Sequence, residues 1–220
     1  MKKLFIAIRN SDLDTVREIL AKKPELVACT AKQPPKKDDG QSPLQVALKT
    51  GNFDIADHLL ALGADVNFME TEPCCNEWRA PVIHDAINAA VMSSRWNTYS
   101  DIMGGLKVHK TKEEAGKAYD MLKKMIDAGA DVNAKDSYGN SCLWRACLQA
   151  SQILPRYNPA ENKMSGERLL TEEVEADLSR IFRLLVKSGA DINYVRPGID
   201  RSVKEFYKNQ TVERFLALEN

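Results

Sequence analysis

The sequence predicts an all-α protein built from antiparallel helix pairs that stack side by side into one elongated array. A five-residue motif, Gly-Ala-Asp-Val/Ile-Asn, begins at Gly63, Gly129 and Gly189. An amphipathic segment with apolar residues at helical spacing precedes each copy, and a shorter apolar segment lies farther upstream. Repeated units of this kind bury their apolar faces against their neighbours, so the pattern predicts a solenoid.

The elements can be placed in order along the chain. A first helix pair is expected between Leu4 and Leu20, and a last pair at Val203–Leu218. Neither is followed by the five-residue motif, so both are interpreted as caps. Each motif glycine is expected one step past a helix, where it can adopt a left-handed conformation. The three middle pairs are expected to have first helices near 42–47, 81–86 and 141–146, and second helices that include 55–60, 122–126 and 181–185.

The order of turn, helix, helix and motif resembles the ankyrin repeat. The fullest match is the run from Asp136 to Ala146, which fits D-x-x-G-x-T-P-L-H-x-A with Ser, Cys and Trp at three positions. His84 keeps the histidine of that pattern and Pro43 its proline. The resemblance implies a single array over residues 1–220, with units at about 1–36, 37–75, 76–135, 136–195 and 196–220.

Two units are longer than the ankyrin period of about 33 residues. The third and fourth each hold 27 extra residues between their two helices, which predicts elongated helices with tips at about Arg95–Lys110 and Pro155–Leu170. A capping box of Thr111 and Glu114 is expected to open one of them.

Composition narrows the classes of function. Lys plus Arg and Asp plus Glu both number 31, so the formal net charge is zero and nucleic-acid binding is not expected. No uncharged run is long enough to cross a membrane, and the apolar run Leu4–Ile8 is shorter than a signal-peptide core. The expected location is the cytoplasm, and the five cysteines are interpreted as free thiols.

Catalytic motifs are not found in the sequence, so the chain is expected to be no enzyme and to need no cofactor. The residues that could serve a metal site are Cys74, Cys75, His84 and His109. Adjacent cysteines lack the spacing with which two thiolates hold one zinc ion. In the ankyrin pattern the histidine at position 84 is structural, so no metal is expected.

The ankyrin resemblance implies a protein partner bound through the hairpin tips and the concave face. The third residue of each turn is expected to be exposed there, and aromatic residues are enriched at interface hot spots. Trp78 and Tyr138 occupy this position, although Trp78 could instead fold back over its own loop and Tyr138 could likewise serve local packing. The predicted partner-binding residues are Trp78, Tyr138, Glu77, Arg79, Ser137 and Asn140.

A second candidate surface is the far end of the elongated helices, where Trp96, Tyr99 and Tyr157 lie. Trp96 and Tyr157 could equally form an apolar plug between the long helices, and Trp144 is assigned to packing. The sequence therefore predicts a non-enzymatic, monomeric protein-binding module. The alternatives are a stoichiometric inhibitor or immunity-type protein of a partner enzyme, self-association through the insertion tips, or a metal or catalytic site on the insertions.

Overall fold

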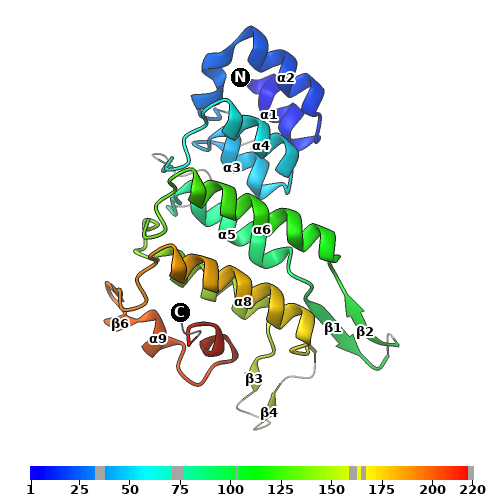
Figure 1. Cartoon of the computed structure of the whole chain (residues 1–220), viewed down its shortest axis with the longest axis vertical. Coiled ribbons are helices and arrows are strands. Elements are labelled where there is room, and N and C mark those ends of the chain that lie inside the picture. Colours follow the sequence, from blue (N-terminus) through cyan, green and yellow to red (C-terminus); the bar gives the residue numbers. More distant parts are fainter. Residues whose placement is uncertain (33–37, 71–76, 103, 159–162, 165–166, 218–220) are drawn as a thin grey trace.

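The computed structural model describes residues 1–32, 38–70, 77–102, 104–158, 163–164 and 167–217. Four helix pairs follow one another along its long axis (Figure 1). Their first helices contact one another in succession and form one layer, and their second helices form the other. The pairs are α1 (Lys2–Arg9) with α2 (Leu13–Lys22), α3 (Pro43–Lys49) with α4 (Phe53–Ala61), α5 (Val82–Met92) with α6 (Lys112–Asp127), and α7 (Cys142–Ile153) with α8 (Glu172–Lys187).

The apolar core lies between the two layers and runs the length of the stack. Leu59 in α4, Leu122 in α6 and Phe182 in α8 are fully buried, as the helical spacing predicts. Trp144 is buried too and packs against Tyr207, which confirms its assignment to packing.

The five-residue motif closes each second helix and ties it to the next repeat. Gly63, Gly129 and Gly189 have φ of +83°, +92° and +95°, which confirms the left-handed conformation predicted at helix ends. Asn133 of the second motif bonds the third motif: its Nδ2 donates to Gly189 O (2.9 Å), and the Asp191 N–H donates to its Oδ1 (2.8 Å). The motif asparagines therefore form a hydrogen-bond ladder along the array.

Replacing Asn133 with alanine is expected to lower the free energy of unfolding by about 1 kcal/mol, because two hydrogen bonds between repeats are lost. Asn193 offers a matched control. It holds the same motif position, but in the described part of the chain its side chain bonds no further repeat. Urea unfolding should show a loss for Asn133→Ala and little change for Asn193→Ala; equal effects would contradict the role of the ladder.

The two long units contain the predicted elongated helices. Thr111 and Glu114 form the expected capping box at α6. The tips, however, contain antiparallel hairpins, β1 (Asn97–Ser100) with β2 (Gly105–Val108) and β3 (Tyr157–Asn158) with β4 (Lys163–Met164). The protein is mostly helical as predicted, but the all-α prediction is wrong at these tips and at a third hairpin, β5 (Val195–Arg196) with β6 (Arg201–Ser202).

The two insertions are bound to each other at their bases. Arg95 donates through Nε and its second guanidinium nitrogen to the buried carboxylate of Asp177, at 2.9 and 3.1 Å. Asn97 is buried, and its amide group exchanges two hydrogen bonds of 2.8 Å with the backbone of Leu169. These contacts cross from the third unit to the fourth, so the insertions form one joint structure.

The ends of the stack differ from the middle. At one end, the 3-10 helix η1 (Pro24–Ala28) replaces the motif loop. At the other, the predicted helix pair is reduced to α9 (Val203–Phe206) and the 3-10 helix η3 (Thr211–Phe215). Val212 and Phe215 are buried there and cover the last full pair. Separately, no helix in the described ranges has the length and apolar character needed to span a membrane.

Candidate functional site

Hairpin tips of successive units lie edge to edge at one end of the helix layers. Figure 1 shows their loops at the end opposite the β1–β2 and β3–β4 hairpins. The Ser137 N–H donates to Arg79 O (2.9 Å), and the Arg79 N–H donates to Ser137 Oγ (3.0 Å). Arg196 Nε donates to Tyr138 O (3.2 Å), which joins the next tip. Backbone and side-chain hydrogen bonds therefore hold three tips in a row.

Four of the six predicted partner-binding residues line one shallow depression between these tips. Glu77, Arg79, Ser137 and Tyr138 surround a volume of about 340 Å³ and are all exposed. Tyr138 keeps 52% of its surface accessible, compared with 37% for Tyr99 and 36% for Phe206. We call these four residues the tip surface.

The other two predicted residues point inward, which corrects the expectation that they are presented to a partner. Trp78 is half-buried, because its indole Nε1 donates to Asp136 Oδ2 (2.9 Å) and the Arg145 guanidinium lies 4.7 Å from its ring centre. Asn140 is 5% exposed, and its Nδ2 donates to the same carboxylate at 2.8 Å. Both residues support the tips from below.

Asp136 is the centre of this support and was not predicted as a site residue. Its buried side chain also accepts the N–H groups of Tyr138 (3.0 Å) and Asn140 (2.9 Å). Burial alone would raise the pKa of Asp136, but hydrogen bonds from Asn140 and Trp78 outweigh it and lower the pKa. The first aspartate of the D-x-x-G motif is the feature that could have identified it.

The two histidines considered for a metal site have separate partners. His84 Nε2 is 3.2 Å from Ala134 O, and burial lowers the pKa of His84 to about 4. His109 stacks on Trp96 and its Nε2 is 2.9 Å from Thr98 Oγ1. Cys74 and Cys75 lie outside the described residues. Within the described ranges, no three His, Cys, Asp or Glu side chains are grouped as metal ligands.

At the second candidate surface, the far end of the elongated helices, Trp96 and Tyr99 differ in exposure. Trp96 is half-buried between His109 and the helix end, and its Nε1 donates to Met92 O (3.2 Å), which favours the packing alternative for this residue. Tyr99 is 37% exposed on β1, and its hydroxyl donates to Asp101 at 2.6 Å. The side chain of Tyr157 lies outside the described part of the structure.

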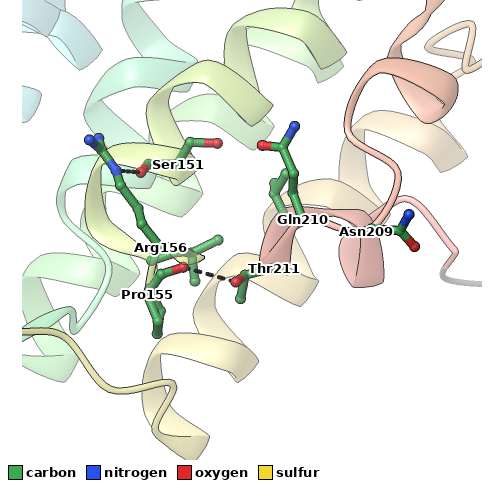
Figure 2. Close-up of a pocket in the computed structure, with 8 residues that line it drawn as sticks. Ser151, Pro155, Arg156, Asn209, Gln210 and Thr211 are labelled. Carbon is green, nitrogen blue, oxygen red and sulfur yellow. Dashed lines mark hydrogen bonds between the residues drawn. The ribbon is translucent and has the colours of Figure 1, made fainter. Parts of the chain in front are cut away.

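A pocket of about 390 Å³ lies between the end of α7 and η3 and was not predicted (Figure 2). Two of its side chains donate hydrogen bonds to backbone carbonyls of the chain. Arg156 Nε folds back to donate to Ser151 O (2.9 Å), and Thr211 Oγ1 donates to Pro155 O (2.9 Å). The residues that line the pocket do not bring an acid, a base and a nucleophile together. The pocket is therefore better interpreted as the packing boundary between the last helix pair and its cap than as a catalytic site.

Comparison with known proteins agrees with the motifs. Residues 2–70 match the family model for ankyrin repeats (3 copies). The ankyrin repeat protein FPV115 of Fowlpox virus (strain NVSL) is 30% identical over 114 residues. That alignment covers 52% of this chain and 20% of the viral protein, so it spans about a fifth of the relative's length. Residues 2–70 of the chain are therefore similar to ankyrin repeats.

Proposed function

We propose that the chain is a non-enzymatic protein-binding module whose partner contacts the tip surface. Ankyrin repeats are generally protein–protein interaction modules. The observation that carries the proposal is the exposure of Tyr138 above a depression that the neighbouring tip completes. An aromatic ring on a preformed backbone loses little conformational freedom on binding, which favours its use as an anchor.

The charges around the ring indicate a mixed interface. Glu77 and Arg79 have opposite signs and flank Tyr138 on the neighbouring tip. Ser137 contributes a hydroxyl that already links the two tips. Such a surface suits a protein partner that covers the tyrosine ring and matches one charge of each sign at the rim, where electrostatics governs association rate and specificity.

Replacing Tyr138 with alanine is expected to weaken partner binding by at least about 30-fold, the size of a hot-spot loss, while changing the melting temperature little. The partner can be found by placing a photo-crosslinking amino acid at position 138 and irradiating the protein in a lysate of its native host. Lys123, exposed on α6, provides a control position on the other helix layer. The captured protein is then titrated against wild type and variant by calorimetry.

The proposal requires a protein that cross-links at position 138, not at 123, and that binds Tyr138→Ala more weakly. A charge reversal at Arg79 serves as a second variant, since its side chain is exposed at the same depression. Equal affinity of wild type and both variants for the captured protein would show that the tip surface does not bind it.

A further inference from the structure

The β1–β2 hairpin has two outer edges, and the register shows which backbone groups each one presents. Asn97 pairs with Val108 and Tyr99 with Leu106. The His109 N–H donates to Trp96 O (2.9 Å), so hydrogen-bonded pairs fall on either side of the Asn97–Val108 pair. The N–H and C=O groups of Asn97 and Tyr99 therefore point outward from β1, and those of Leu106 and Val108 point outward from β2.

The outer edge of β1 is already covered by the chain itself. The Tyr99 N–H donates to Glu167 O (2.8 Å), and the Asn97 side chain bonds both backbone groups of Leu169. A segment of the fourth unit thus lies along β1, and its Glu167 carbonyl accepts the outward N–H of Tyr99.

The outer edge of β2 has no such cover in the described part of the chain. No described group bonds the outward N–H or C=O of Leu106 or Val108. Their side chains are 46% and 50% exposed, and Ile102 at the turn is 96% exposed. An exposed edge strand with apolar side chains is a template for pairing with another strand.

The position of Lys107 decides which occupant fits this edge. In the two-fold pairing of two copies that is centred on Lys107, Leu106 pairs with Val108 of the second copy. Lys107 would then stand directly opposite itself, and like charges opposite each other are destabilising. Lys107 is exposed and forms no ion pair among the described residues. This register is therefore unfavourable for a second copy, and the exposed charge of Lys107 favours a strand with a negative charge at its centre.

A second cation lies nearby. Arg168 stacks over the Trp96 ring at 5.4 Å. Partial burial, and then the positive charges of Lys107 and Arg168, lower the pKa of His109. Two cations thus act on one imidazole, and this ribbon face is electropositive. Leu106 and Val108 project from the opposite face, which Tyr99 shares because paired residues lie on the same side.

We propose that β2 binds an extended segment of a partner protein with an apolar–acidic–apolar sequence, added antiparallel to the hairpin. Its apolar side chains lie beside Leu106 and Val108, and its carboxylate lies opposite Lys107. Main-chain hydrogen bonds at Leu106 and Val108 hold the segment, and the acidic residue selects it. This site is separate from the tip surface and does not depend on the function proposed for it.

The test uses the full-length protein labelled with ¹⁵N and the synthetic peptide acetyl-Thr-Val-Glu-Val-Thr-amide, with a peptide containing lysine in place of glutamate as the control. Chemical-shift changes are expected at the amides of residues 105–108 with the acidic peptide and to be at least about fivefold weaker with the basic one. Lys107→Glu is expected to reverse this preference. Tyr138→Ala is expected to leave it unchanged.

Val108→Pro tests the backbone part of the proposal. The Val108 N–H points away from β1, so proline removes the outward donor without removing a bond of the hairpin. Retained shifts across β1 would verify that the hairpin is intact in this variant, and peptide binding should be lost. The proposal is overturned if wild type binds both peptides equally, if the shifts map elsewhere, or if an intact Val108→Pro hairpin binds as wild type does.

Discussion

Replacing Asp136 with alanine is expected to lower the free energy of unfolding by about 3–5 kcal/mol, the cost of removing one partner of a buried charge pair. The carboxylate is fully buried and 3.1 Å from the guanidinium of Arg145. Its removal leaves that cation, the Trp78 indole N–H and the Asn140 amide without their acceptor. Buried donors without partners are costly, because they lose water on folding and gain nothing in return.

Asp136→Asn is the matched control for this prediction. It keeps the side-chain shape and one oxygen acceptor but removes the charge, so its loss should be clearly smaller than that of alanine. Chemical unfolding followed by far-UV circular dichroism measures both. Because Asp136 also accepts the Tyr138 N–H, the alanine variant should disturb the amide resonances of residues 137–139. An alanine variant as stable as the asparagine variant would show that the carboxylate is not the centre of the network.

The regular part of the fold follows from local features of the sequence. A glycine one residue beyond an apolar helix can be read as a left-handed cap, because other side chains resist that conformation. The boxes at Ser42 and Thr111 are likewise local, since each hydroxyl bonds a backbone group three residues away. Such devices depend on a few neighbouring residues, so the sequence predicts them well.

The insertion hairpins depend on contacts that the sequence does not display. The segment 97–108 carries a Gly-Gly turn between residues of fair strand propensity, but four-residue strands are marginal alone. Their base is fixed by Asn97 bonding Leu169 and Arg95 bonding Asp177, partners more than 70 residues away. The lengths of the insertions could be predicted from the repeat period, whereas their pairing could not.

The same distinction divides the candidate site. Tyr138 is exposed because the tight turn that ends at Gly139, with φ of +79°, places it at the tip, which is a local property. Trp78 has the equivalent position in its own unit but turns inward toward Asp136, which lies 58 residues away. The position in the repeat therefore predicted which two aromatic residues lie at the hairpin tips, and long-range hydrogen bonding decided which of the two is exposed.

Two neighbouring residues of α5 are expected to give opposite pH dependences of stability. Burial lowers the pKa of His84 from 6.5 to about 4 and raises the pKa of Asp85 from 3.8 to about 6. Between these pH values the unfolded chain binds more protons at His84 than the folded chain does, so the contribution of His84 makes the protein more stable as pH rises. At Asp85 the folded chain binds more protons than the unfolded chain does, so the contribution of Asp85 makes the protein less stable as pH rises. Each effect amounts to about 3 kcal/mol from pH 4 to 6.5.

The surroundings of the two side chains explain why they oppose each other. His84 reaches toward the fourth unit, where Arg145 adds to the lowering of its pKa and Asp136 counters it. Asp85 reaches toward the second unit, where Gln45 donates to it at 3.0 Å and Lys49 is 3.9 Å away. The attraction of Lys49, with help from Gln45 and Arg145, only partly offsets burial and the repulsion of Glu70. Helix α5 thus carries one buried titrating group toward each neighbouring unit.

Urea unfolding at pH 4, 5, 6 and 7 separates the two contributions. Relative to wild type, Asp85→Asn is expected to become progressively more stable as pH rises, because the cost of ionising the buried carboxyl is removed. His84→Gln is expected to become progressively less stable relative to wild type over the same range, because the unfolded wild-type chain loses its His84 proton as pH rises and the glutamine variant has no such proton to lose. Subtracting the free energy of unfolding of wild type from that of each variant removes the contribution of the surface carboxylates, because they titrate in the same way in all of these proteins. In the double variant the free energy of unfolding should depend on pH as it does in wild type, since the two removed contributions are nearly equal and opposite. If each single variant also showed the wild-type pH dependence, neither group would titrate with the shifted pKa.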